Sequence, residues 1–268
     1  MSELLSRPAT IDVPKGRELI EALLTVRGEL GSSYSRFHRY STRNLGFLAM
    51  QGCPMEPVAT FNRWKELGRQ VQRGEKAYSI LRPIQVKVRG EQDGDQDDEV
   101  KMIRRFKVVK ALFAVSQTAG EDLPPYEPPA WSRERAMQAL DITEVPFEHY
   151  DGNVQGFSYD RNLAVSPVAV YPFKTWAHEA GHIMGGHTTE QRLAEYQEHR
   201  GPFEFEAEAT AHLVLKTLGA DDQFNAAESR GYIQHYMRGE QPTEKNFSTI
   251  LNSTGRIVEA GYEEVSGE

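Results

Sequence analysis

The feature that most constrains this chain is a His-Glu-x-x-His motif at residues 178–182. Residues four apart in an α-helix lie one turn apart on the same face, so His178 and His182 present two imidazole nitrogens to one point. A single ion such as Zn²⁺ can bind both nitrogens. The carboxylate of Glu179 lies beside the first histidine, where it reaches a metal-bound water rather than the metal. The motif predicts a metal-binding helix on which Glu179 acts as the general base.

The residues on either side of the motif favour a helix with defined ends. Pro172 suits the first turn, because a first-turn residue needs no backbone N–H donor. Gly185 and Gly186 predict the end of the helix, since glycine adopts the left-handed conformation that follows many helices. The alternative interpretation is an ordinary helix that carries two histidines and a glutamate by chance. A third ligand would separate the two interpretations.

A catalytic metal site of the zincin type needs a third protein ligand, because three ligands and one water leave the metal open for chemistry. One extended form of the motif places a third histidine at the position that Thr188 occupies here. His187 is one residue short of that position. The sequence therefore argues against this form of the site.

A second helix, with the Glu204 carboxylate near its start, is predicted from Pro202 to about Leu218. Its Glu-x-x-Ala-Glu pattern is similar to gluzincin-like sites, in which a second helix packs across the first and Glu204 would be the third ligand. Glu208, one turn further along, would accept a hydrogen bond from a metal-binding histidine. Glu206 points elsewhere under helical spacing and is the second choice, so the third ligand stays open among these three glutamates. The alternative is a solvated acidic helix start, because carboxylates favour helix N-termini.

Composition describes a soluble globular protein, with 39% hydrophobic and 26% charged residues in a chain of 268. No apolar run approaches the ~20 residues that cross a bilayer, and residues 1–15 lack the pattern of a signal peptide. Neither a membrane partner nor export is expected. Cys53 is the only cysteine, which excludes an intrachain disulfide and a thiolate metal cluster and fits a cytoplasmic location.

The charge is divided unequally along the chain. Residues 1–125 carry 20 Lys and Arg against 16 Asp and Glu, whereas residues 126–268 carry 11 against 23. This asymmetry suggests two modules with different partners. A rigid, Pro-rich stretch lies between them. We therefore predict a first domain at 1–120, a linker at 121–130 and a second domain at 131–268.

Local patterns predict an α+β fold, in which a small domain of helices and a β-hairpin precedes the metal-binding domain. Pro83 should occupy an edge or a bulge of its strand, because proline lacks the N–H donor. Thr60 and Ser41 are expected to cap helices. The acidic stretch 90–99 is interpreted as a solvated hairpin connection. The predicted helices are 17–30, 40–51, 61–67 and 131–140, the predicted strands 77–88, 100–115, 145–150, 154–159 and 162–166, with a turn at 151–153.

A basic and aromatic segment lies at residues 34–89, with 11 Lys and Arg against 3 Asp and Glu. Such a surface suits single-stranded nucleic acid, because cations contact the phosphates and aromatic rings stack on the bases. The alternative is that the rings form a core and the charges a solvated face. The segment shows neither helix-turn-helix spacing nor paired zinc-finger ligands, so sequence-specific recognition of duplex DNA is not expected.

Several short runs resemble a known family. The runs 40–44, 59–64, 68–71 and 73–77 resemble the N-terminal single-stranded-DNA-binding domain of ArdC-type antirestriction proteins. The later half is similar to the zincin-like domain that is paired with it, which is related to ImmA/IrrE-type peptidases. That similarity rests on Gly156-Phe157-Ser158-Tyr159-Asp160, on the His-Glu-x-x-His helix and on the segment around Glu204. The acidic stretch 90–99 matches no motif of the family.

The resemblance implies particular site residues. It places Zn²⁺, or another divalent ion such as Mn²⁺, on His178, His182 and Glu204, with Glu179 as the general base. Two of the implied DNA contacts have alternative interpretations: Trp64 could belong to the core, and Asn44 could cap or pin a loop. The implied DNA contacts are Arg43, Asn44, Trp64, Arg69, Arg73 and Lys76.

The resemblance also implies a function, that of a mobile-element or phage protein that shields incoming DNA from host restriction. Its expected partners are single-stranded DNA, bound by the first domain only because the second is acidic, and a protein substrate of a metallopeptidase. One alternative is a regulatory metallopeptidase that cleaves a repressor. Another is a non-enzymatic DNA-binding factor, whose metal domain is a scaffold or a docking surface for a restriction enzyme.

Overall fold

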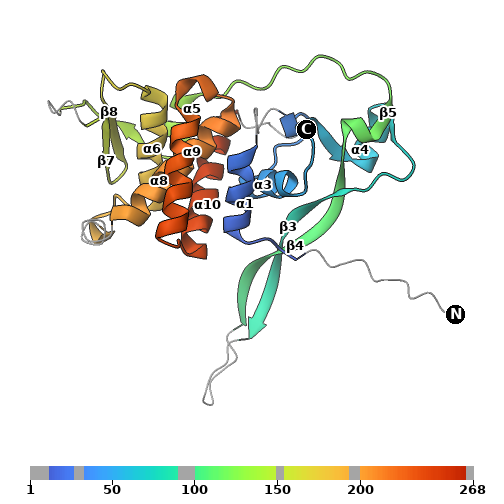
Figure 1. Ribbon diagram of the computed structural model, residues 1–268, viewed down its shortest axis with the longest axis horizontal. Coiled ribbons are helices and arrows are strands. Elements are labelled where there is room, and N and C mark those ends of the chain that lie inside the picture. Colours follow the sequence, from blue (N-terminus) through green and yellow to red (C-terminus); the bar gives the residue numbers. More distant parts are fainter. Residues whose placement is uncertain (1–11, 27–32, 90–99, 149–153, 193–199, 264–268) are drawn as a thin grey trace.

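The structure is a computed structural model that describes residues 12–26, 33–89, 100–148, 154–192 and 200–263. The predicted acidic connection at 90–99 and the predicted turn at 151–153 lie outside the described residues. Helices and small sheets are mixed along the chain (Figure 1), so the predicted α+β fold class is confirmed. Among the residues that the structure describes, no helix combines the length and the apolar character needed to cross a membrane.

The N-terminal half combines short helices with a sheet. Thr60 caps α4 as predicted, since its hydroxyl accepts a hydrogen bond from the Arg63 N–H at 3.2 Å. Ser41 occupies the cap position of α3 without a capping hydrogen bond from its side chain. The elements are α1 (Gly16–Thr25), α3 (Thr42–Met50), β1 (Val58–Thr60), α4 (Phe61–Glu66), β2 (Arg69–Val71), β3 (Tyr78–Arg89), β4 (Val100–Ala114), the 3₁₀ turn η1 (Val115–Gln117) and β5 (Thr118–Gly120).

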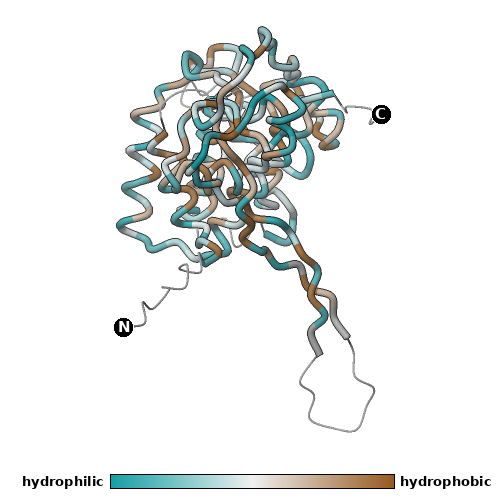
Figure 2. The backbone as a smooth tube through the Cα atoms, turned by 90° about the vertical axis from the view of Figure 1, so that its right-hand side faces the viewer, coloured by the Kyte–Doolittle hydropathy of each residue, from teal (hydrophilic) through white to brown (hydrophobic). Residues whose placement is uncertain are grey.

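Strands β3 and β4 form a long antiparallel pair that projects from the rest of the molecule (Figures 1 and 2). The strand order β1-β4-β3 puts β3 at an edge, so Pro83 occupies an edge strand as predicted. The irregularity in the pairing lies at Tyr78 and Ser79, not at the proline. A separate two-stranded sheet pairs β2 with β5.

The C-terminal half is mainly helical. Helix α6 packs between α8 and the small sheet of β7 and β8, while α10 packs against α8, α6 and α1. The elements are α5 (Arg133–Ala139), β6 (Thr143–Glu144), β7 (Gly156–Tyr159), β8 (Asn162–Val165), α6 (Pro172–Gly185), α8 (Arg200–Leu218), the 3₁₀ turn η2 (Asp221–Gln223), α9 (Ala226–Gly239) and α10 (Glu244–Ala260).

Two predictions about this half were wrong in detail. Residues 145–148 of the predicted strand 145–150 form no strand, and β6 instead pairs in parallel with β8. Strand β7 pairs with β8 in antiparallel fashion, which leaves β7 at an edge of the sheet. Helix α8 spans Arg200–Leu218 and so includes two residues before the predicted start at Pro202, a proline that the first turn tolerates because no N–H donor is needed there. Glu204 therefore lies one turn inside the helix.

One hydrophobic core joins the two halves. Residues 121–130 contain no helix or strand and run along the surface between β5 and α5 (Figure 1). The halves nevertheless share buried side chains, so they are packed together and not joined by this segment alone. The shared core contains Leu19, Leu23, Leu45, Phe47, Leu81 and Leu112 from the first half and Phe205, Leu213, Ile233, Phe247 and Leu251 from the second.

The shared core predicts cooperative unfolding. Phe205 stacks on Tyr236 at 4.7 Å between ring centroids and meets Phe247 edge-on at 6.1 Å. We expect Phe205→Ala to lower the free energy of unfolding by about 3–5 kcal/mol, measured by urea denaturation. Val168→Ala, at a side chain that is 76% exposed, should change it by less than about 0.5 kcal/mol. Two separate transitions in the wild type would contradict a common core.

Candidate metal centre

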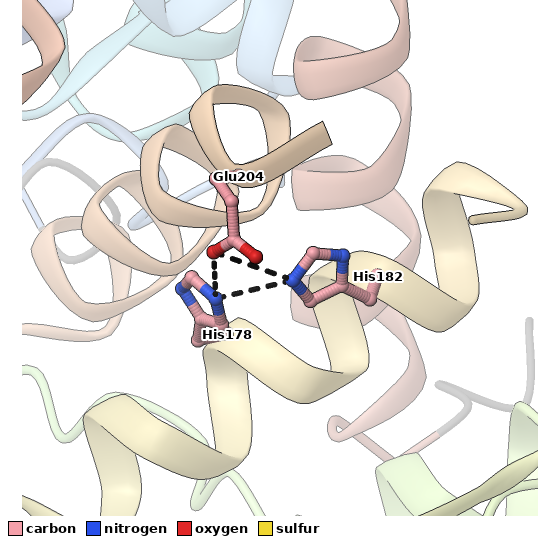
Figure 3. A group of neighbouring side chains, drawn as sticks. All are labelled: His178, His182 and Glu204. Atoms are coloured by element: carbon pink, nitrogen blue, oxygen red, sulfur yellow. Dashed lines mark hydrogen bonds and ion pairs between the residues drawn. The ribbon is translucent and has the colours of Figure 1, made fainter. Parts of the chain in front are cut away.

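The structure brings the three predicted ligands together (Figure 3). The Nε2 atoms of His178 and His182 are 3.2 Å apart. The Oε2 atom of Glu204 lies 3.3 Å from the first of these nitrogens and 3.8 Å from the second. Donor atoms at the usual distances from a tetrahedral Zn²⁺ lie roughly 3.4 Å from one another. The spacing of the three atoms therefore fits one ion at their centre.

The crossing of two helices creates this arrangement. A Cβ added to Gly181 would lie 3.2 Å from the Cα of Ala207, so glycine at this position permits α8 to cross closely over α6. Helix α6 spans Pro172–Gly185 and is capped by Gly186, whose φ of 73° is the left-handed conformation predicted there. The Oε1 atom of Glu204 accepts a hydrogen bond from Arg200 at 3.1 Å. Oε2, the other oxygen, faces the histidines.

A chain of hydrogen bonds orients His178 from behind. Its Nδ1 lies 3.3 Å from Oε2 of Glu208, the residue predicted for this position. Lys174 approaches the same oxygen at 2.7 Å, and the Ser229 hydroxyl donates to Oε1 at 2.6 Å. Burial acts to raise the pKa of Glu208, but these three hydrogen bonds and the positive charge of Lys174 outweigh it and hold the pKa at about 2. The carboxylate is therefore ionised and accepts the Nδ1–H of His178, which leaves Nε2 for a metal.

A second chain, the His187 chain, orients His182. The Nδ1 atoms of His182 and His187 are 3.0 Å apart. Nε2 of His187 lies 2.7 Å from Oε2 of Glu206, and the Asn246 amide donates to Oε1 of the same carboxylate at 2.6 Å. Burial lowers the pKa of His187, which keeps the ring neutral. If Nε2 of His182 faces a metal, its Nδ1–H donates to His187, which in turn donates from Nε2 to Glu206.

The sequence indicated Glu206 as an alternative ligand and placed His187 one residue short of a ligand position, and the structure turns both away from the three ligand atoms. The left-handed turn at Gly186 folds the chain back, so that His187 lies against His182. Asn246 comes from α10, far along the chain, and no local pattern signals its contact with Glu206. In the sequence, the only sign of the His187 chain was a polar residue, His187 itself, shortly after the ligand pair His178 and His182.

Glu179 lies where the sequence predicted it, on the same helix and 7% exposed. Its Oε2 accepts a hydrogen bond from the Ser158 hydroxyl at 2.7 Å, a partner on β7 that the sequence did not reveal. Both side chains line a hollow of about 610 Å³, together with the two ligand histidines and Glu204. A second hollow of about 470 Å³ lies against His178 and Glu204 and extends to Tyr232. The ligand group thus sits where two hollows meet.

The predicted DNA contacts are divided by the structure. Trp64 is fully buried and its indole N–H donates to the Phe113 carbonyl at 2.8 Å, so it cannot stack on a base in this conformation. Asn44 donates to the Leu81 carbonyl and accepts from the Leu81 N–H, which pins α3 to β3. Trp64 thus occupies the core position, and Asn44 the pinning role, that were the alternatives to DNA contact.

The arginines and the lysine differ among themselves. Arg69 donates to the Thr118 hydroxyl at 2.8 Å and to neighbouring carbonyls, so it fastens β2 to β5. Arg73 and Lys76 are exposed in the turn before β3. Arg43 lies over the ring of Phe106 at 5.6 Å, and burial lowers its pKa. Arg43, Arg73 and Lys76 therefore remain candidates for contact with phosphates.

The fold and the site define a two-part α+β protein with a helix-borne group of metal-ligand side chains. Residues 25–111 match the family described as the N-terminal domain of anti-restriction factor ArdC. A metal-free crystal structure of the antirestriction ArdC protein from the R388 plasmid is 18% identical, with a TM-score of 0.53, and the match covers 91% of this chain and 95% of that chain. Residues 25–111 thus match the N-terminal domain that the motifs predicted, and the fold of the chain is similar to that of the plasmid protein.

The Mn(II)-bound structure of the same plasmid protein is 16% identical, with a TM-score of 0.47, over 94% of this chain and 98% of that chain. No curated protein matches the sequence.

The His187 chain predicts an effect on metal affinity. We expect His187→Phe, which removes the acceptor for His182, to weaken Zn²⁺ binding by about 10–100-fold, measured by competition with a fluorescent chelator. His235→Phe, the same substitution at an exposed position of α9, should leave the affinity unchanged. Equal affinities for the two variants would show that the chain does not orient the ligand.

The two carboxylates around His178 predict a pH dependence. Burial acts to lower the pKa of His178, but hydrogen bonds to Glu204 and Glu208 outweigh it and raise the pKa to about 9. A metal must displace this proton, so affinity should rise with pH up to about 9 and fall about tenfold per pH unit below that value. In Glu208→Gln, which removes one carboxylate charge, the plateau should begin at a lower pH. Affinity that stays constant between the ordinary histidine pKa of ~6.5 and 9 would contradict this account.

Proposed function

We propose that this protein is an antirestriction protein that binds single-stranded DNA through its N-terminal half and hydrolyses peptide bonds at a divalent-metal site. The observation that carries the proposal is the group formed by His178, His182 and Glu204, with the buried Glu179 carboxylate on the same helix. The match to the N-terminal domain of anti-restriction factor ArdC supports the biological role.

The donor set fits a catalytic Zn²⁺. Two imidazole nitrogens and one carboxylate oxygen are ligands of hydrolytic zinc sites, in which the fourth position stays open. Imidazole suits Zn²⁺, whereas Mn²⁺ favours oxygen ligands, so Zn²⁺ is the metal that this set favours. When bound, the metal supplies a Lewis acid and lowers the pKa of a water molecule.

The protein's own groups supply the proton transfer. Glu179 takes a proton from the attacking water and delivers it to the leaving amine. The Ser158 hydroxyl, which donates to Oε2 of Glu179, fixes the carboxylate in the hollow. His178 and His182 keep their Nε2 atoms aimed at the metal because hydrogen bonds hold each ring at Nδ1.

The shape of the site favours a peptide as the substrate. Strand β7 is an edge strand of its sheet and lines the hollow beside Glu179, so an extended peptide can add to it by backbone hydrogen bonds. The second hollow, on the side of Tyr232, provides room for the chain beyond the scissile bond. Val170 and Tyr171 line both hollows and are exposed by 74% and 38%, which favours apolar side chains near the bond.

Glu179→Gln tests the enzymatic part of this proposal. The variant should retain about one Zn²⁺ per chain, because Glu179 is not a ligand, and should lose at least about 100-fold of peptide cleavage, measured with a quenched fluorescent peptide library. Glu190→Gln, at an exposed position, is the matched control.

The same two variants separate the enzymatic from the non-enzymatic account of antirestriction. Transfer of a plasmid into a restricting host should be protected by the wild type and by Glu190→Gln, but not by Glu179→Gln. Full protection by Glu179→Gln would mean that the metal domain acts as a scaffold or docking surface. A wild-type protein that binds no Zn²⁺ would contradict metal-dependent hydrolysis altogether.

A further inference from the structure

A larger hollow lies away from the metal group, between the N-terminal half and α10. Its volume is about 1160 Å³. One wall comes from residues 37–44 together with β3 and β4, and the other from residues 249–259 of α10. Met184 and Gly185, at the end of α6, also line it. We name this hollow the arginine cleft, after four arginines on its walls, which are Arg39, Arg43, Arg63 and Arg256.

The arginine cleft is positively charged. Glu259 is its one acidic residue among the described side chains that line it, against four arginines, of which Arg63 is ion-paired with Glu66 at 2.9 Å. Arg39 and Arg43 each lie over an aromatic ring, at 5.1 Å from Tyr262 and 5.6 Å from Phe106, and the charge of the Glu244 carboxylate also acts on Arg43. The exposed side chain of Arg256 forms neither an ion pair nor a hydrogen bond with any residue in the described part of the chain.

The positions of these charges suit a polyanion with flat, apolar groups. Arginine binds phosphates through a planar fork of N–H donors. Phe37, Tyr40 and Phe106 line the same cleft and offer aromatic surface for bases. The volume exceeds the roughly 300–1,000 Å³ of a typical small-molecule pocket, which favours an extended ligand over a single nucleotide.

We propose that the arginine cleft binds single-stranded DNA and that α10 supplies Arg256 as a phosphate contact. This placement rests on the single-strand binding proposed above and adds the C-terminal half to it. The sequence had favoured binding by residues 1–120 alone, because the second half is acidic overall. In the structure, however, Arg256 of the second half lines the same cleft as Arg43 of the first half.

The test uses the full chain and a fluorescein-labelled oligothymidylate, whose binding is measured by fluorescence anisotropy over a series of salt concentrations. Arg256→Ala should weaken binding at low salt. It should also reduce the slope of log K against log salt by about 0.7, the loss of one phosphate contact on a single strand. Arg238→Ala, at an exposed position of α9 outside the cleft, removes the same charge and should change neither quantity.

The other outcomes overturn the proposal in distinguishable ways. Equal losses in Arg256→Ala and Arg238→Ala would mean that only net charge matters. Normal binding by Arg256→Ala, with a loss in Arg73→Ala, would leave single-strand binding intact but place it at the turn before β3. A wild type that does not bind the oligonucleotide at any salt concentration would end both the placement and the DNA-binding part of the proposed function.

Discussion

The close crossing of α6 and α8 is the contact on which the metal group depends. Neither helix alone holds three ligands, because α6 supplies two histidines and α8 the carboxylate of Glu204. Their axes approach only because Gly181 meets the backbone of Ala207 without a side chain between them. A bulkier residue at either position would move Glu204 away from the histidines, and ligand distances near 3.3 Å tolerate little displacement. The geometry of the site is therefore set by packing before any metal binds.

Buried polar groups are costly unless each has a partner, and this site satisfies them through two chains that lead outward from the ligands. Glu208 receives hydrogen bonds from His178, Lys174 and Ser229. Glu206 receives them from His187 and Asn246. The two carboxylates have the same task on opposite sides of the ligand pair, although only one of them contacts a ligand directly. Helix α8 thus supplies one glutamate toward the metal and two that hold the histidines in place.

Local patterns were sufficient to predict the α+β class, the helix that carries the motif, the edge position of Pro83 and the meeting of Glu204 with the two histidines. The first three depend on spacing along one element or on the chemistry of one residue type, whereas the meeting of Glu204 with the histidines was predicted from the similarity of its pattern to gluzincin-like sites. The role of Asn246 and the burial of Trp64 were not predictable, because each depends on which distant element packs against it. The predicted strand 145–150 differs at its described residues for a local reason: Val145 donates to the Leu163 carbonyl of β8 at 2.9 Å, but Pro146 has no N–H with which to continue the pairing. The shared core of the two halves is likewise invisible to composition, which divides the chain at a proline-rich stretch.

Net charge was a poor guide to the surface of the second half. Its count of acidic residues includes Glu179, Glu206 and Glu208, which are buried and hydrogen-bonded within the metal group. Carboxylates that are paired and surrounded by protein contribute little to the potential at a distant surface, and salt screens exposed charges beyond roughly 10 Å. A ligand in the arginine cleft would contact this half mainly through the wall formed by α10, where Arg256 lies. An acidic half can thus contribute a basic wall, because electrostatic recognition depends on where charges lie and not on their sum.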